Sequence, residues 1–343
     1  MATSVLMYRA GIWVVNTFLV VNTMNCNYCE WRCDLSAGHG VCERYLEKDK
    51  RIVEAEPFDW IEFYPYTIES MPFYHVLPDQ YVIQTGTVSC NAKCCYCINA
   101  HLAIEKAHQP KLKHKNAQQF VDFVKQTESA GVVFAINEIT CFIPSAFEIA
   151  DLLHAEGLKC GCLTNAFQTE ETAALLAEKM DFINVSLKSL SDDFYKKDLG
   201  LPSVAPVLRN IKIFNEKTHL EIVTPIVREL ADGGIYEIMD FLYSVNPEMV
   251  WHLFRLMPNY KRADERDMGY EDMVAIYETA RKKLPFTYLG NFAGSKWINT
   301  YCPDCGELLV KRISTGAWLG GTQQNNLVGN KCPHCGRIIP GVF

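Results

Sequence analysis

Three closely spaced cysteines are the residues of this sequence best suited to do chemistry. Cys90, Cys94 and Cys97 form a Cys-x3-Cys-x2-Cys loop directly after an apolar run, 81–88, that reads as a strand. A [4Fe–4S] cluster usually takes four thiolates, one per iron, so three thiolates leave one iron free to bind and reduce a small molecule. A zinc site or buried free thiols are the alternatives. Cys95 could replace Cys94 only in a Cys-x4-Cys-x-Cys spacing, which matches no ligand pattern that we can assign. We therefore interpret Cys95 as a packed thiol.

Composition limits the class of protein. The chain has 343 residues with 49% hydrophobic content, enough for one large domain with appendages or for two domains. Its net charge of −7 argues against nucleic-acid binding, which needs a concentrated basic surface. The clustered cysteines favour metal sites over a disulfide framework, so we expect a reducing cytoplasm. The apolar run 11–21 is interrupted by Asn16 and is too short to cross a membrane, and no good signal-peptide cleavage site follows it.

The middle of the chain alternates β-rich runs with amphipathic stretches. Strands are predicted at Val82–Val88, Val132–Ile136, Lys159–Leu163, Asp181–Ser186, Leu220–Thr224, Met249–Phe254 and Phe286–Leu289. Helices are predicted between them, at Asn116–Ser129, Ser145–Glu156, Glu170–Met180, Val204–Glu216, Ile235–Tyr243 and Tyr270–Lys283. This alternation indicates a parallel sheet with helices outside, a partial (β/α)6 to full β/α barrel. The cysteine loop then follows the first strand, at the edge where such barrels place their sites.

Polar residues stand at the ends of several predicted strands, where packing alone would need few of them. They are candidates for contacts with a ligand, although turn or cap residues, or a satisfied core histidine, are the plainer interpretation of each. The candidates are Asn137, Glu138, Asn165, Ser186, Lys188 and His252.

Two further cysteine sets lie outside the predicted barrel. Two Cys-Pro-x-Cys-Gly knuckles near the C-terminus predict one tetrahedral four-thiolate site for zinc or, in a rubredoxin-like module, for one iron. Its residues are Cys302, Cys305, Cys332 and Cys335. The N-terminal set predicts an auxiliary [4Fe–4S] cluster or a zinc site, and it consists of Cys26, Cys29, Cys33 and Cys42. The three remaining cysteines, Cys141, Cys160 and Cys162, lie in or beside apolar stretches and are expected to be buried thiols.

The cysteine loop with Tyr96 before its third cysteine resembles the cluster loop of radical S-adenosylmethionine (radical SAM) enzymes. The longer stretch 86–99 is similar to that of the AmmeMemoRadiSam family, a relative of the pyruvate formate-lyase activating enzymes. Similar stretches recur in the same order at 133–138, 163–165, 183–188, 194–197, 206–208 and 288–291. The N-terminal cysteines and the C-terminal knuckles also match, so the resemblance covers the chain from about residue 25.

This resemblance implies a cofactor and a site. S-adenosylmethionine would bind the free iron and be cleaved by one electron to methionine and a 5′-deoxyadenosyl radical. Asn137 and Glu138 stand where relatives have a Gly-Gly-Glu turn that contacts the cofactor's amino group. Ser186-Leu-Lys188 stands where the activating enzymes have Asp-Leu-Lys. The lysine is retained as a partner for the carboxylate of S-adenosylmethionine, whereas the aspartate that contacts the ribose is replaced by serine. Asn165 falls in a matching stretch, and His252 matches a rim histidine.

We therefore predict a radical SAM enzyme that abstracts hydrogen from a protein or peptide. The barrel is expected at 81–290, between a Cys-rich segment at 1–80 and a four-Cys ribbon at 291–343. Alternatives are a small-molecule mutase, methylase or ring-forming enzyme, with or without cobalamin, and a non-catalytic metal-bearing scaffold. The expected partners are the substrate and a reductant such as flavodoxin or ferredoxin, with no nucleic acid and no membrane.

Overall fold

The computed structural model describes residues 25–36, 38–105, 110–228, 233–266, 268–294, 296–316 and 320–343. The apolar run 11–21 lies outside these residues. Among the described residues, no helix is long and apolar enough to cross a membrane.

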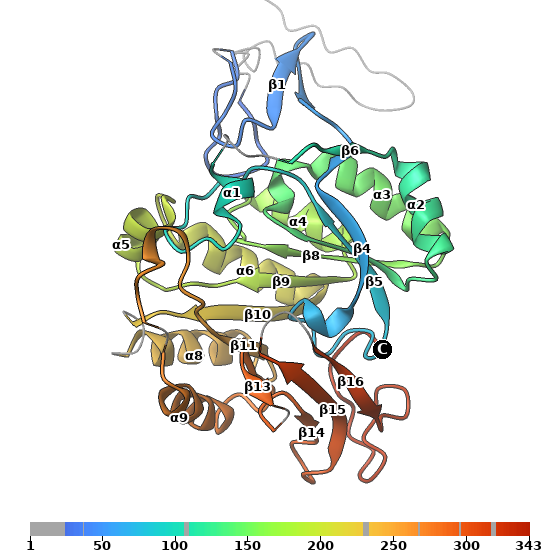
Figure 1. Ribbon diagram of the computed structural model, residues 1–343, viewed down its shortest axis with the longest axis vertical. Coiled ribbons are helices and arrows are strands. Elements are labelled where there is room, and N and C mark those ends of the chain that lie inside the picture. The colour runs from blue at the N-terminus through green and yellow to red at the C-terminus, as the bar shows by residue number, and fades with distance from the viewer. Residues whose placement is uncertain are drawn as a thin grey trace, which may run out of the picture.

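An eight-stranded sheet forms the centre of the molecule (Figure 1). Its strands run in the order β12-β11-β10-β9-β8-β7-β5-β4. All seven predicted strands are present, with bounds that differ by a residue or two: β5 (Tyr81–Gly86), β7 (Gly131–Ile136), β8 (Lys159–Thr164), β9 (Phe182–Ser186), β10 (His219–Ile226), β11 (Val250–Arg255) and β12 (Thr287–Gly290). These seven are parallel to one another, as expected of apolar strands joined by helices.

The predicted helices are also present. They are α2 (Ala117–Gln126), α3 (Ile143–Ala155), α4 (Glu170–Lys179), α6 (Ala205–Lys217), α8 (Gly234–Val245) and α9 (Tyr270–Arg281). Short elements fill the loops: α1 (Ala100–Ala103), η2 (Ile139–Cys141), α5 (Asp192–Phe194), the π-helix η3 (Tyr195–Leu199) and η4 (Tyr260–Arg262). Each main helix buries one apolar face against the sheet, and α2 begins with a reciprocal capping box between Asn116 and Gln119.

The sheet is open, so the partial barrel is confirmed and the full barrel is wrong. An antiparallel strand, β4 (Glu62–Thr67), pairs only with β5 and ends the sheet, and β12 ends it on the other side. No described strand joins these two edges. β4 precedes residue 81, the predicted start of the barrel, so the N-terminal part of the chain contributes to the central sheet.

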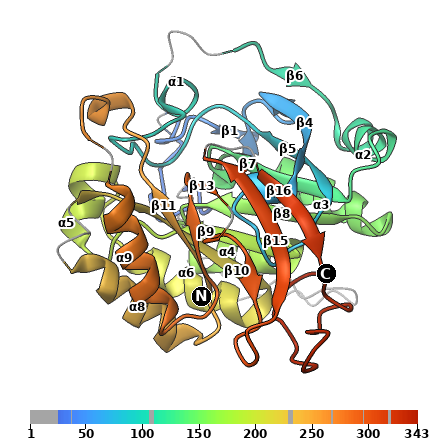
Figure 2. The same ribbon diagram turned by 60° about the horizontal axis from the view of Figure 1, so that its bottom comes forward.

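The C-terminal residues form a four-stranded ribbon that packs beside the open sheet (Figure 2). Its strands are β13 (Ala293–Gly294), β14 (Thr300–Tyr301), β15 (Leu308–Thr315) and β16 (Gly320–Asn325). β16 contacts η1 (Ile68–Ser70), and Val342 pairs with Val76. The ribbon therefore covers the segment between β4 and β5.

The N-terminal residues lie at the other end of the molecule in Figure 1. They include the hairpin of β1 (Tyr45–Lys48) and β2 (Arg51–Glu54), and the pair of β3 (Asp59–Trp60) and β6 (Lys113–His114). The Tyr45 hydroxyl donates to the Thr140 carbonyl at 2.8 Å and accepts from the Ile143 N–H at 3.0 Å. These bonds attach the hairpin to the loop after β7, at the carboxyl edge of the sheet.

Candidate functional site

The cysteine loop leaves the sheet at the carboxyl end of β5, as predicted. Gly86 is required there, because a Cβ at this residue would lie 2.1 Å from the carbonyl oxygen of Ile136 on β7. The loop is then anchored to η3: the N–H groups of Lys93 and Cys95 donate to the carbonyls of Leu199 and Asp198, each at 2.7 Å. Backbone bonds thus fix the loop's position without using the thiols.

The three thiols of the loop lie too far apart for a single metal ion. Four thiolates around one zinc ion at 2.3 Å are about 3.8 Å from one another. Among the described residues, Cys90, Cys94 and Cys97 do not form a group whose sulfur atoms all lie within 4.8 Å. Such spacing fits thiolates that bind different irons of one cluster. The zinc alternative for this loop is therefore not favoured.

The environment of the loop affects how readily its thiols ionise. Burial raises the pKa of Cys90 well above its usual value, and burial raises that of Cys94 to about 11. The Lys188 ammonium acts in the opposite direction on the pKa of both Cys94 and Cys97. Lys188 therefore lies near the loop, on the side of its second and third cysteines. Metal binding must deprotonate these thiols, so loading of the site should be pH-dependent.

Several buried polar atoms around the loop have no partner in the protein, which is the condition expected of a site that receives a polar cofactor. A buried polar group without a hydrogen bond costs about 1–3 kcal/mol. The unpartnered atoms on and beside the loop are Thr85 Oγ1, Thr87 Oγ1, Tyr96 OH and Asn137 Oδ1. The residues present thus fit a ligand that carries both donors and acceptors.

Asn137 has the clearest geometry of this group. Its φ of 64° lies in the left-handed region, which explains why relatives can place glycine in this turn and why asparagine is a tolerated replacement. Its Nδ2 donates to the Thr87 carbonyl at 2.5 Å, while Oδ1 has no partner. Asn137 thus offers a free acceptor beside the cysteine loop.

Glu138, the neighbouring residue, is instead saturated by internal donors. The side chain is 2% exposed, and one carboxylate oxygen accepts from the Asn165 N–H at 2.7 Å. The other accepts from the hydroxyls of Thr140 and Thr164, from the Thr140 N–H and from the Gln168 amide. Burial raises the pKa of Glu138. The carboxylate connects the ends of β7 and β8, and most of its acceptor capacity is used by these internal donors.

Asn165 faces the cysteine loop. Its Nδ2 donates to Asn91 Oδ1 at 2.6 Å and lies 3.8 Å from Cys90 Sγ. Ser186 ends β9 and is partly exposed at the same edge of the sheet. Their contacts with a cofactor remain predictions.

His252 was predicted to stand on the rim, and the structure places it elsewhere. It is the third residue of β11, wholly buried, with Nε2 at 2.5 Å from a carboxylate oxygen of Glu221. The rings of Tyr74 and Tyr288 pack against it. Glu221 also accepts from the N–H groups of Tyr74 and His75. His252 therefore belongs to a buried network under the rim, and we do not assign it to the cofactor.

The C-terminal cysteines form the compact site that their spacing predicts. Their four ligand atoms all lie within 4.8 Å of one another. Cys302 and Cys335 are 3.5 Å apart, and Cys305 and Cys332 are 3.6 Å apart, close to the separation expected around one metal ion. The geometry fits a zinc-ribbon-like module, and the same four thiolates suit zinc or a single iron.

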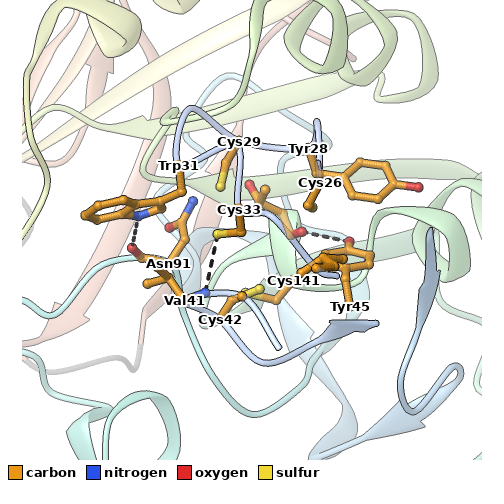
Figure 3. Close-up of a pocket in the computed structure, with 13 residues that line it drawn as sticks. Cys26, Tyr28, Cys29, Trp31, Cys33, Val41, Cys42, Tyr45, Asn91 and Cys141 are labelled. Atoms are coloured by element: carbon orange, nitrogen blue, oxygen red, sulfur yellow. Dashed lines mark hydrogen bonds between the residues drawn. The ribbon is translucent and has the colours of Figure 1, made fainter. Parts of the chain in front are cut away.

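The N-terminal cysteines line one small pocket together with Cys141 (Figure 3). Cys141 is wholly buried, as are Cys160 and Cys162, so their predicted burial is confirmed. Nothing in the sequence indicated that Cys141 lies beside the N-terminal set, because it belongs to η2, far along the chain. Asn91 was also missed, since an asparagine inside a cysteine loop carries no signal of its own.

Comparison with known proteins identifies the central domain. Residues 85–242 match the model of the radical SAM superfamily. This part of the chain is similar to the radical SAM superfamily. The match supports an enzyme, so the scaffold alternative is set aside. The match begins in β5 and includes the cysteine loop, Asn137, Asn165 and Lys188.

Individual relatives are distant. An uncharacterized protein of Methanocaldococcus jannaschii is 24% identical over 277 residues, which are 79% of this chain and 81% of that protein. Among solved structures, SuiB of Streptococcus suis bound to S-adenosylmethionine aligns with a TM-score of 0.46 and 17% identity, over 61% of this chain and 47% of SuiB. This chain thus spans about half the length of SuiB. A pyruvate-formate lyase-activating enzyme domain from Bacteroides vulgatus aligns with a TM-score of 0.34 and 18% identity, over 41% of this chain and 89% of that domain.

Proposed function

We propose that this radical SAM enzyme holds a [4Fe–4S] cluster on Cys90, Cys94 and Cys97. When bound, the cluster and S-adenosylmethionine supply a 5′-deoxyadenosyl radical that abstracts hydrogen from the substrate. The observation that carries this proposal is the spacing of the three thiols, too wide for one metal ion, on a loop surrounded by unpartnered polar atoms. The finer AmmeMemoRadiSam assignment rests on the sequence resemblance.

Different residues around the loop would bind different groups of S-adenosylmethionine. Asn137 Oδ1 is a free acceptor for the cofactor's ammonium group, and the Lys188 ammonium is a partner for its carboxylate. Asn165 and Ser186 add polar contacts at the ends of β8 and β9. Glu138 holds the Asn165 backbone and so orients the Asn165 amide toward Cys90. An external one-electron donor, of the flavodoxin or ferredoxin class, is required.

The test replaces all three loop cysteines with alanine. Anaerobically purified wild-type protein with a strong reductant should release 5′-deoxyadenosine from S-adenosylmethionine, and the triple variant should not. Cys95→Ala is the matched control, because Cys95 lies in the same loop with its N–H and sulfur directed to Asp198. Cleavage that persists in the triple variant would refute the proposed function.

For the substrate we propose a protein or peptide, by resemblance to the activating enzymes. A specific observation favours the small-molecule alternative as a second candidate. The C-terminal ribbon packs on the segment between β4 and β5, so it covers part of the open side of the sheet through which a polypeptide would otherwise enter. A small pocket lies between the ribbon and the ends of β11 and β12, and Tyr74, Asn291 and Arg312 line it.

Deuterium transfer separates the two substrate classes. A lysate from cells grown in heavy water is divided into a protein fraction and a small-molecule filtrate, and each is incubated with the enzyme. Hydrogen abstraction from a deuterated carbon gives deuterated 5′-deoxyadenosine, which mass spectrometry detects. We expect the label with the protein fraction. If deuterated 5′-deoxyadenosine forms only with the filtrate, the substrate is a small molecule and not a protein or peptide.

A further inference from the structure

We infer that the cavity lined by Cys26, Cys29, Cys33, Cys42 and Cys141 holds a second iron–sulfur cluster, and that the Asn91 side chain joins this cluster to the radical cluster. The inference rests on the proposed function only for the identity of the radical cluster. The occupancy of the N-terminal cavity is argued from its own geometry.

Five cysteines line this pocket, but their sulfur atoms are not gathered around one point as ligands of a single ion would be. Among the described residues, no three of the five sulfur atoms lie within 4.8 Å of one another. The C-terminal four-thiolate site of the same chain meets that limit, so the difference is a property of the two sites. Thiolates spread around a cavity can each bind a different iron, whereas one zinc ion needs them close together. This geometry selects the cluster over zinc, the two occupants that the spacing alone left open.

The walls of the cavity are those of a cluster site. None of the described residues that line it carries a charged side chain, and the aromatic rings of Tyr28, Trp31 and Tyr45 contribute much of its wall. The Val41 N–H donates to Cys33 Sγ at 3.4 Å. Gly40 is required here, because a Cβ would lie 2.8 Å from Cys33 Cβ and 2.9 Å from its sulfur. The turn at 40–42 therefore places a backbone donor and Cys42 around the same space.

Cys141 contributes to this site from the barrel side. It lies on η2, after β7, and lines the same pocket as Cys42 (Figure 3). The Ser89 hydroxyl donates to the Cys42 carbonyl at 2.6 Å. The N-terminal cavity and the radical loop are thus held against each other at one edge of the sheet.

Asn91 occupies the space between the two sites and is 1% exposed. On one side, its Oδ1 accepts from Asn165 at 2.6 Å and lies 3.9 Å from Cys90 Sγ. On the other side, its Nδ2 has no hydrogen-bond partner among the described residues and points toward Cys29 (Figure 3). Trp31 Nε1 fixes the Asn91 backbone by donating to its carbonyl at 2.8 Å. A single amide side chain thus separates Cys29 from Cys90.

The first experiment asks whether the cavity holds a cluster when the radical site cannot. The Cys90→Ala/Cys94→Ala/Cys97→Ala variant is reconstituted anaerobically, and iron, zinc and acid-labile sulfide are counted. We expect about four irons and four sulfides per chain. Adding Cys26→Ala, Cys29→Ala and Cys33→Ala should remove the sulfide. Sulfide is the decisive count, because a single iron or zinc at the C-terminal site brings none. A variant that carries no sulfide, or a second zinc per chain, would overturn the inference.

This count is independent of the proposed function. If the variant retains sulfide but the wild-type protein does not cleave S-adenosylmethionine, the proposed radical function is refuted and the second cluster is still supported. If the wild type cleaves S-adenosylmethionine but the variant contains no sulfide, the second cluster is refuted and the radical function is supported.

The second experiment tests the connection through Asn91. In the wild type with both clusters reduced, the electron paramagnetic resonance spectrum should show magnetic interaction, and it should differ from the sum of the single-cluster spectra. In the variant without the radical cluster, Asn91→Ala should lower the reduction potential of the remaining cluster, since a donor to a ligand sulfur favours the more negative, reduced state. Lys93→Gln, an exposed change in the same loop, is the control. A simple sum of spectra, or an unshifted potential, would overturn the connection.

Discussion

A substitution at Asn137 tests how the cofactor's ammonium group is bound. Asn137→Gly removes the free Oδ1 acceptor but keeps the left-handed backbone, since glycine adopts a φ of 64° without strain. Asn137→Ala removes the same side chain and adds the strain of a Cβ in this region, about 1–2 kcal/mol. Both variants also lose the bond from Nδ2 to the Thr87 carbonyl. The pair therefore separates the side chain's role from that of the backbone.

A hydrogen bond to a charged group contributes about 1.5–3 kcal/mol, so Asn137→Gly should weaken S-adenosylmethionine binding by roughly ten- to a hundredfold. Titration of the cofactor against the paramagnetic signal of the reduced cluster measures this affinity. Asn137→Ala should lose at least as much affinity and should also unfold at lower urea concentration. Wild-type affinity in Asn137→Gly would refute the assignment of Asn137 Oδ1 to the cofactor's ammonium group, because this oxygen is the only atom of the side chain that is free to accept from the cofactor.

Three further changes test the surrounding structure. Glu138→Ala should lower the free energy of unfolding by about 3 kcal/mol or more, since each buried donor left without an acceptor costs about 1–3 kcal/mol; unchanged urea unfolding with lost cofactor affinity would instead return Glu138 to the cofactor. Cys302→Ser or Cys335→Ser should lower the melting temperature and release one metal ion per chain, and unaltered metal content and stability would mean that the knuckles bind none. The donors and histidines around Glu221 hold its pKa below its usual 4.5 despite burial. Its stabilising contribution is therefore present above pH 4.5 and is lost as the pH falls toward the folded-state pKa. Melting curves of Glu221→Gln should show lower stability at neutral pH and a smaller loss on acidification than the wild type, and parallel curves would contradict this.

The sequence predicted the parallel strands well because each is a short apolar run followed by an amphipathic stretch. It did not predict β4, whose sequence Glu-Phe-Tyr-Pro-Tyr-Thr carries Pro65 in its middle. Proline cannot donate to a neighbouring strand, and it is tolerated here because β4 is the edge of the sheet with one partner. An edge strand of this kind is recognised only once its partner is known.

The cysteine sets differ in how far spacing alone could define them. The C-terminal knuckles are local turns, so their Cys-x2-Cys pairs already imply a compact site. The N-terminal set is completed from far along the chain: Cys141 comes from the loop after β7, and Asn91 from the radical loop. Both reach the cavity only because the N-terminal segment docks on the carboxyl edge of the sheet, where Thr169 donates to the Asn27 carbonyl and Tyr45 bonds to the chain around Cys141. The spacing of the N-terminal cysteines could suggest a metal site, but it could not show which residues from the rest of the chain line the same pocket.

The misplacement of His252 has a physical cause in the open sheet. In a parallel sheet that does not close, another part of the chain must cover the inner faces of the last strands. Polar residues on those strands can therefore bind either a ligand or this covering segment. Here Glu221 on β10 accepts from the N–H groups of Tyr74 and His75, and His252 on β11 bonds to Glu221. Arg312 of the ribbon packs over the Tyr74 ring and donates to the Tyr74 carbonyl. The histidine thus helps to bind the chain segment and the ribbon that cover the gap between β4 and β12. A polar residue on the last strands of an open sheet can be assigned to a cofactor only after the covering segment is known, whereas Asn137 and Lys188, beside the cysteine loop, do not depend on it.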